Sequence, residues 1–332
     1  MKIAILGTGA IGGFIGARLA LADPQHQHSQ ISAYARGANL SALRQHGWRL
    51  QTAQQLHQTA VYAASDNAAE LGPQDVVIIA VKAPALVSIA QSIGPMLTPQ
   101  TLIVPAMNGV PWWILRGLPN LDPHLRSIDA DRQLEQLLAY PQVAGCVVHA
   151  SCTVPEPGLV QHVMGQGLIL GLADQQQGAQ HQPSLEGLLQ RLQSAGFEAS
   201  LSQAIRRDIW YKLWGNLTMN PVSAITGATI DKILDDPLLR EFCSAAMREA
   251  ATIGAAIGCE LTQDPEARHA VTRKLGAFKT SMLQDVLAGR TLEIDSLVGA
   301  VHEIAGKLAL PVPHISALFG LVRVFAQERG LY

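Results

Sequence analysis

Charged residues are scarce in this sequence. Asp, Glu, Lys and Arg make up 15% of its 332 residues, whereas hydrophobic residues make up 48%. The formal net charge is −2, so there is no basic surplus for binding nucleic acid or an anionic membrane surface. Such a composition is typical of a well-packed globular protein. It also favours an oligomer, here expected to be a homodimer, in which a second copy covers apolar surface.

Paired cysteine motifs, metal-ligand patterns and long apolar runs are also lacking. The chain has four cysteines without C-x-x-C spacing, and its eleven histidines show no spacing typical of metal ligands. We therefore expect buried free thiols in a reducing, cytoplasmic compartment and predict no metal site. No apolar run approaches the length of a membrane span, and the short run at the start, which ends at Gly7, is explained by a strand and a turn rather than a signal peptide.

The first thirteen residues carry the strongest pattern in the chain. Ile3–Leu6 are four consecutive apolar residues, as in a buried strand of a parallel sheet, and Gly7, Gly9 and Gly12 follow in a G-x-G-x-x-G array. A helical pattern then continues to about Ala22. In this order the first glycine makes the turn, the second lets backbone N–H groups approach a pyrophosphate, and the third lets the helix lie close to the strand. The array predicts a dinucleotide site; a glycine-rich turn without a ligand is the alternative.

The end of the second expected strand, residues 31–35, indicates which dinucleotide is bound. Folds that take NAD usually carry Asp or Glu here to hold the ribose 2′-hydroxyl. This chain has Arg36, whose guanidinium suits a 2′-phosphate. We therefore predict NADPH rather than NADH, a surface arginine being the alternative.

Two further buried strands end in polar side chains. Residues 75–81 are followed by Lys82, and residues 102–105 are followed closely by Asn108. Because ligands bind at the carboxyl ends of strands in such sheets, both side chains are candidates for contacts with cofactor or substrate. The alternatives are a solvated lysine and an ordinary Asn-Gly turn.

Patterns in the rest of the first half fit a doubly wound domain over residues 1–203. We expect a β-ribbon within residues 48–63, an inserted loop with a short helix rather than core over 117–141, strands at 143–149, 159–163 and 168–172, and a helix over 184–195.

From Ile205 onward helical periodicity replaces the strand pattern, so residues 204–332 are predicted to form an all-helical second domain, with long helices at 292–309 and 314–328. Lys212, Asn216 and Asn220 recur every four residues and therefore form one polar stripe on an otherwise apolar helix. Burying such a stripe costs free energy unless partners satisfy it, and a ligand is one such partner. Glu293 is a carboxylate in an equally apolar neighbourhood.

Several motifs in order along both domains resemble the ketopantoate reductase (2-dehydropantoate 2-reductase) family. They are Gly7-Thr8-Gly9-Ala10-Ile11-Gly12-Gly13, Val81-Lys82-Ala83, Asn108-Gly109, Trp210-Tyr211-Lys212-Leu213 with Asn216 and Asn220-Pro221, and Ser281-Met282-Leu283-Gln284-Asp285 with Glu293-Ile294-Asp295. The resemblance implies an NADPH-binding Rossmann domain, a helical C-terminal domain and an active site between them.

The resemblance also implies a role for each matching residue. The catalytic positions are Lys212, as proton donor, and the active-site glutamate Glu293. Substrate-binding positions are Asn108, Asn216, Asn220 and Ser281. Cofactor-contacting positions are Gly7, Thr8, Gly9, Ala10, Ile11, Gly12, Arg36, Lys82 and Asn108.

The expected activity is NADPH-dependent reduction of a 2-keto acid, 2-dehydropantoate first, to the 2-hydroxy acid. The sequence departs from the family pattern at Ile230 and Phe278, where substrate-binding asparagines are expected, and in the pair Trp112-Trp113. These indoles form either a substrate wall or ordinary packing. A bulkier or more apolar 2-keto acid is one alternative substrate. A β-hydroxyacid or opine-type dehydrogenase is a second alternative, and a non-catalytic NADPH-sensing regulator is a third.

Overall fold

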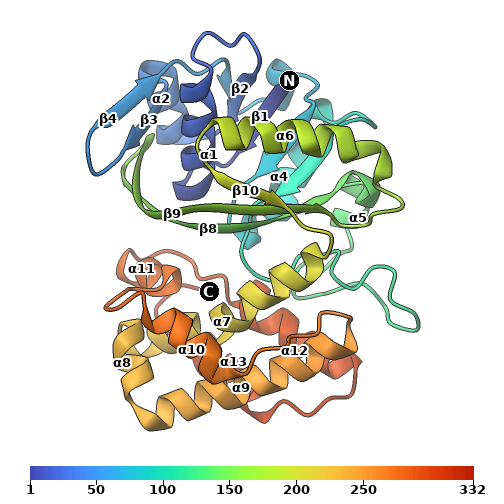
Figure 1. The fold of residues 1–332 in the computed structure, drawn as a ribbon, viewed down its shortest axis with the longest axis vertical. Coiled ribbons are helices and arrows are strands. Elements are labelled where there is room, and N and C mark those ends of the chain that lie inside the picture. The colour runs from blue at the N-terminus through green and yellow to red at the C-terminus, as the bar shows by residue number, and fades with distance from the viewer. The chain divides into compact units, whose positions relative to one another are not determined.

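The computed structural model describes residues 1–332, which divide into two compact units (Figure 1). The first comprises Met1–Met107 and Gln133–Ile205, and the second comprises Asn108–Arg132 and Arg206–Tyr332. The first unit ends at Ile205, two residues beyond the predicted boundary at 203. The prediction placed residues 108–132 in the first domain, whereas the structure groups them with the second unit. This segment belongs to the second unit because apolar side chains such as Ile114 and Leu125 are buried in the helical core.

A five-stranded parallel sheet forms the centre of the first unit. Its strands, in sheet order, are β5 (Ala64–Ser65), β2 (Gln30–Tyr34), β1 (Lys2–Leu6), β6 (Val76–Ile79) and β7 (Leu102–Pro105). All four pairings are parallel. The strand order steps outward from β1 on both sides, which confirms the predicted doubly wound sheet. β5 was not predicted because two residues carry no periodicity.

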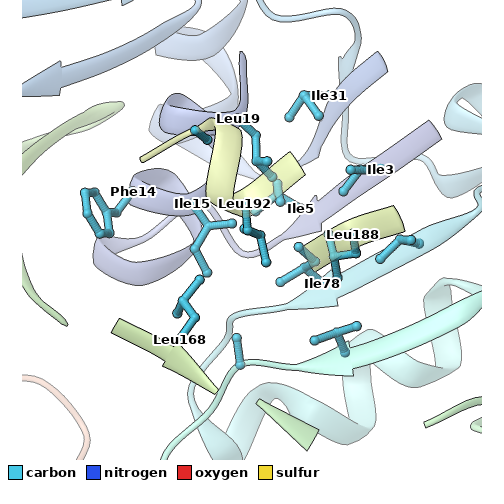
Figure 2. Close-up of a cluster of buried hydrophobic side chains, with 14 of the residues drawn as sticks. Ile3, Ile5, Phe14, Ile15, Leu19, Ile31, Ile78, Leu168, Leu188 and Leu192 are labelled. Carbon is cyan, nitrogen blue, oxygen red and sulfur yellow. The ribbon is translucent and has the colours of Figure 1, made fainter. Parts of the chain in front are cut away.

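Helices cover this sheet. They are α1 (Ala10–Ala22), α2 (Gly37–His46), α3 (Ala68–Leu71), α4 (Leu86–Ser92), α5 (Leu134–Leu137) and α6 (Gln182–Ser194). Figure 2 shows the buried core that α1 and α6 form with the strands, through Ile3, Ile5, Phe14, Ile15, Leu19, Ile31, Ile78, Leu168, Leu188 and Leu192. The apolar face of α1 thus fixes where the glycine-rich turn before it lies.

A second, mixed sheet lies in the same unit. Its strands are β10 (Glu198–Leu201), β9 (Leu159–Leu172), β3 (Trp48–Gln51) and β4 (Leu56–Thr59) in that order, with β8 (Ala144–Glu156) paired to β9. The antiparallel β3–β4 pair confirms the predicted ribbon. The two strands predicted at 159–163 and 168–172 are one strand. Gly165, at φ +73°, carries it past an irregular register with β8, and a Cβ there would lie 2.4 Å from the His149 carbonyl oxygen.

The second unit is helical, as predicted. Its helices are α7 (Ile205–Thr226), α8 (Ile230–Asp235), α9 (Pro237–Ala256), α10 (Pro265–Arg273), α11 (Ser281–Leu287), α12 (Ala300–Lys307) and α13 (Pro313–Gln327). The predicted helix over 292–309 is instead a π-helical turn, Asp295–Gly299, that continues into α12. None of the helices in the structure combines the length and apolarity needed to cross a membrane.

Two side-chain predictions have clear outcomes in the cores. Trp112 and Trp113 are buried, at 5% and 0% exposure, which supports packing rather than a substrate wall. All four cysteines are free thiols, and Cys146, Cys243 and Cys259 are buried. Burial raises the pKa of Cys243 to about 12 and that of Cys259 to about 11, so both stay protonated at neutral pH.

Candidate active site

The glycine array forms the turn between β1 and α1. Gly7 adopts φ +86°, and a Cβ on Gly12 would lie 2.0 Å from the Gly7 carbonyl oxygen, so only glycine lets the helix approach the turn this closely. A Cβ on Gly9, by contrast, would meet no atom within 4 Å. The first and third glycines are therefore required by the fold, whereas the second borders open space that a bound group can approach.

The surroundings of Gly9 fit a pyrophosphate. Gly9 is the N-cap of α1, no side chain caps this helix, and its first turn contains no acidic residue. The free N–H groups and the helix dipole at such an end attract an anion. In addition, the hydroxyl of Thr8 is buried and has no hydrogen-bond partner. A phosphate oxygen would satisfy both the N–H groups and this hydroxyl.

Arg36 is the N-cap of α2, whose N-terminus also lacks a capping side chain and acidic residues. Its exposed guanidinium lies 5.8 Å from the Tyr34 ring centroid and makes only long contacts, 3.5 Å each, to the hydroxyls of Tyr34 and Ser92. A cation held this loosely at a helix N-terminus fits a second phosphate. Lys82 is half-buried and lies three residues beyond the end of β6, which ends at Ile79 rather than at the predicted Val81.

Asn108 follows β7 but belongs to the second unit, where a tight turn holds it. Gly109 adopts φ +90°, and a Cβ there would lie 2.6 Å from the Ser296 carbonyl oxygen. The N–H of Val110 donates to that same oxygen at 2.8 Å. The turn is thus fixed against the π-helical segment. Sequence reasoning missed Ser296, because nothing in its local pattern distinguishes it.

The orientation of Lys212 follows from two tryptophans on α7. The indole N–H of Trp210 donates to the Ala250 carbonyl at 3.1 Å, and that of Trp214 donates to the Met247 carbonyl at 2.6 Å, both on α9. Both indoles are buried. Lys212 lies about 200° around the helix from each, so anchoring the tryptophans on α9 directs the lysine away from it.

The Lys212 ammonium donates a hydrogen bond of 2.7 Å to the Asn108 side-chain oxygen. The lysine is half-buried, so its charge is partly removed from water. This contact brings together two residues that the sequence placed in different domains. It also fixes the amine at one end of the polar stripe on α7.

The other two members of the stripe differ in burial. Asn216 is half-buried, whereas Asn220 is 5% exposed and its amide nitrogen has no hydrogen-bond partner. An unsatisfied buried donor costs about 1–3 kcal/mol. The next residue, Pro221, lies inside the helix and supplies no N–H to the Leu217 carbonyl. Functional sites commonly retain such locally unfavourable features.

Glu293 and Ser281 lie on other segments of the second unit. Glu293 is half-buried, and its neighbours in the sequence, Leu292 and Ile294, are almost fully buried. Ser281 is exposed at the start of α11. Arg290, three residues before Glu293, forms an ion pair with Asp285 at 3.1 Å.

The predicted site residues therefore form two groups. The glycine array with Thr8, Ala10 and Ile11, Arg36 and Lys82 lies in the first unit, and Asn108, Lys212, Asn216, Asn220, Ser281 and Glu293 lie in the second. Among these, the structure shows direct contact between Lys212 and Asn108. One group can hold an anionic dinucleotide, and the other presents an ammonium, amides and a carboxylate suited to a small polar substrate.

Comparison with known proteins identifies the family of the chain. The sequence model "Ketopantoate reductase PanE/ApbA" matches residues 3–175, and the model of the C-terminal region of the same family matches residues 204–326. The chain belongs to the ketopantoate reductase family. It is thus an oxidoreductase acting on CH–OH groups, and nicotinamide dinucleotides are the cofactor class of this family.

Individual members of the ketopantoate reductase family match over the whole chain. A 2-dehydropantoate 2-reductase from Mesorhizobium japonicum (strain LMG 29417 / CECT 9101 / MAFF 303099) is 38% identical over 100% of both chains. A crystal structure assigned as a ketopantoate reductase from Ralstonia solanacearum MolK2 is 49% identical, with a TM-score of 0.91 over 100% of this chain and 99% of that chain. A crystal structure of a PanE/ApbA family ketopantoate reductase from Ralstonia eutropha JMP134 is 26% identical, with a TM-score of 0.81 over 99% of this chain and 100% of that chain.

Proposed function

We propose that this protein reduces a 2-keto acid to the 2-hydroxy acid with NADPH, and that 2-dehydropantoate is its substrate. The observation that carries the proposal is the hydrogen bond between the Lys212 ammonium and the Asn108 amide oxygen, in a chain that belongs to the ketopantoate reductase family. The amide oxygen accepts a hydrogen bond from the ammonium and so fixes the position of the amine.

Reduction of a ketone needs a hydride at the carbonyl carbon and a proton at the carbonyl oxygen. A nicotinamide cofactor supplies the hydride when it is bound. The protein's part is to polarise the carbonyl and deliver the proton. Lys212 would donate a hydrogen bond to the carbonyl oxygen and transfer its proton as negative charge develops there. Asn216, Asn220 and Ser281 would hold the substrate, and Glu293 would bind a substrate hydroxyl or orient the lysine.

The first unit would hold the dinucleotide. The N–H groups at the start of α1 and the Thr8 hydroxyl would bind the pyrophosphate, with Gly9 leaving room for it. Arg36 and the N-terminus of α2 would bind the 2′-phosphate, and Lys82 and Asn108 would contact other polar atoms of the cofactor.

The cofactor assignment has a direct test. Arg36→Ala should weaken NADPH binding about tenfold or more and leave NADH binding within about twofold, because only NADPH has the 2′-phosphate. Arg44→Ala is a matched control, since Arg44 is an exposed arginine in the last turn of the same helix. Equal losses for both dinucleotides in Arg36→Ala would contradict the assignment.

The substrate assignment is tested by steady-state oxidation of NADPH with 2-dehydropantoate and a panel of other 2-keto acids. We expect 2-dehydropantoate to give the highest kcat/KM. If no 2-keto acid is turned over, the reductase proposal fails.

A bulkier or more apolar 2-keto acid is the second candidate substrate, and one feature of the second unit favours it. Ile230 is buried, its N–H donates to the Phe278 carbonyl at 3.1 Å, and both residues pack in an apolar cluster with Met219 and Val222. These neighbours flank Asn220 on α7. In the substrate panel, a preference for an aromatic or branched apolar 2-keto acid would favour this candidate.

The homodimer also stays a prediction. Sedimentation equilibrium of the purified protein should give twice the mass of the chain, and a single-chain mass would contradict it.

A further inference from the structure

The last two residues of the sequence contact the segment that carries Glu293. The N–H of Leu292 donates to the Leu331 carbonyl at 2.9 Å, and the Tyr332 hydroxyl donates to a carboxylate oxygen of Asp295 at 2.9 Å. Leu331 is buried in the core of the second unit. Glu293 thus lies between two residues, Leu292 and Asp295, that form hydrogen bonds with Leu331 and Tyr332.

Asp295 also begins the π-helical turn. Its main-chain carbonyl accepts a hydrogen bond from the N–H of Ala300, five residues later, which is the defining bond of a π-helix. A Cβ on Gly299 would lie 3.1 Å from the Asp295 carboxylate oxygen and 3.2 Å from the Phe319 ring. The carboxylate therefore lies in a narrow space, and its hydrogen bond to Tyr332 limits how the turn can shift.

The same turn supports the other side of the candidate site. Ser296, next to Asp295, accepts the hydrogen bond from Val110 N–H that fixes the Asn108–Gly109 turn. Asn108 in turn accepts the hydrogen bond from Lys212. Contacts within one unit therefore connect Tyr332 through Asp295 and Ser296 to the two residues at the centre of the proposed chemistry.

We propose that Tyr332 is a positioning residue for the reaction: its hydrogen bond to Asp295 holds the π-helical turn in the geometry that places Glu293 and the Asn108–Lys212 pair. The proposal rests on the proposed function, because it concerns residues given catalytic and binding roles there.

The protonation of Tyr332 suits a hydrogen bond to Asp295 that persists across the neutral pH range. Burial and the neighbouring carboxylate raise the pKa of Tyr332 to about 12, so the hydroxyl remains a donor throughout the neutral range. Burial raises the pKa of Asp295, while the Tyr332 hydrogen bond and the nearby Arg323 oppose that rise. A hydrogen bond to an ionised carboxylate is about twice as strong as one between neutral groups.

Tyr332→Phe tests the proposal because it removes one hydroxyl from a half-exposed ring. We expect kcat with 2-dehydropantoate and NADPH to fall about five- to tenfold, the KM for NADPH to stay within twofold, and the melting temperature to change little. Tyr62→Phe is a matched control: Tyr62 is 48% exposed against 46% for Tyr332, and it lies in the first unit. It should match the wild type in all three measurements.

A second measurement does not depend on turnover. In hydrogen–deuterium exchange of the protein without ligands, Tyr332→Phe should speed exchange at residues 292–300 and 109–110, and Tyr62→Phe should not. Unchanged kcat together with unchanged exchange would overturn the positioning role, and so would faster exchange with unchanged kcat. If wild-type protein turns over no 2-keto acid, the proposed function fails on its own. Exchange alone then decides whether Tyr332 holds the turn, and unchanged exchange overturns the link as well.

Discussion

The ammonium of Lys212 and the side-chain oxygen of Asn108 lie 2.7 Å apart, although 104 positions separate the two residues in the chain. Each is placed by a different device. The buried indoles of Trp210 and Trp214 orient Lys212, and the Gly109 turn against Ser296 places Asn108. Both arrangements lie within the second unit.

Lys212→Ala should therefore lower kcat by about three orders of magnitude, since it removes both the proton donor and the group that polarises the carbonyl. The dissociation constant for NADPH, measured by fluorescence titration, should change less than about threefold. Lys232→Ala, at an exposed lysine on α8, should leave both values unchanged. Turnover by Lys212→Ala at more than a tenth of the wild-type rate would contradict the assigned role.

Asn108→Ala should produce a smaller loss, about tenfold to a hundredfold in kcat/KM, because the lysine remains but is no longer held. Asn108→Ala in the Lys212→Ala background should cost little more, since the two residues act as one unit. A double-mutant cycle measured by single-turnover kinetics separates this from two independent effects, which would multiply.

The sequence could predict those parts of the site in which the spacing of residues along the chain determines their positions in a turn or on a helix. The glycine array and the Lys212, Asn216 and Asn220 stripe depend only on local turns and helical periodicity, and the structure has the turn and the helix as predicted. The Asn108 contact was not predictable in this way. It depends on residues 108–132 folding with the second unit, and no local pattern signals such a return of the chain.

The failures in the fold have similar causes. β9 was divided in two because Gly165 and Gly167 interrupt its apolar alternation, although glycine at an irregular pairing lets the strand continue. The π-helical turn was read as ordinary helix because Leu297, Val301 and Ile304 keep helical spacing across it. A π-helical turn contains one residue more than an α-helical turn. Here tertiary contacts of Asp295, rather than helix propensity, determine where that residue is accommodated.

Two glycine substitutions should separate folding from binding. Gly12→Ala puts a Cβ 2.0 Å from the Gly7 carbonyl oxygen and should destabilise the protein by about 3 kcal/mol or more. Gly9→Ala meets no atom within 4 Å, and its φ of −73° suits alanine, so stability should change by less than about 1 kcal/mol. Binding of NADPH to Gly9→Ala should nevertheless weaken at least tenfold. Urea denaturation and a binding titration measure the two effects, and normal binding by Gly9→Ala would argue against a pyrophosphate at this turn.

Acid should destabilise the protein partly through His269. This side chain is 3% exposed and bonds the Ser244 hydroxyl at 3.0 Å. Burial lowers the pKa of His269 from 6.5; Glu266 opposes the shift, and the charges of Arg240, Arg273 and Arg268 add to it. The unfolded chain therefore binds more protons than the folded one below about pH 6.5, and the free energy of unfolding falls as pH falls through that range.

His269→Gln should reduce this acid sensitivity, because glutamine still bonds Ser244 but does not titrate. Between pH 7 and 5.5 the wild type should lose up to about 1 kcal/mol more stability than the variant, measured by urea denaturation at each pH. His181 is also buried, and burial lowers its pKa, so it adds to the acid sensitivity of both proteins. The free energy of unfolding of a variant that also replaces His181 with Gln should therefore depend still less on pH. Parallel pH curves for wild type and His269→Gln would contradict the assignment.

Replacing Asn220 should raise the stability of the protein and lower its activity. Its amide nitrogen is buried and has no partner, so Asn220→Leu, which keeps a similar volume, removes an unsatisfied donor and should stabilise the protein by about 1 kcal/mol. If the donor is kept for the substrate, kcat/KM for the 2-keto acid should fall about tenfold to a hundredfold, while the NADPH dissociation constant stays unchanged. Thermal melts, saturation kinetics and a titration give the three values. A purely structural asparagine would show the opposite result, lower stability with unchanged kcat/KM, because the substitution would then disturb packing without removing a substrate contact.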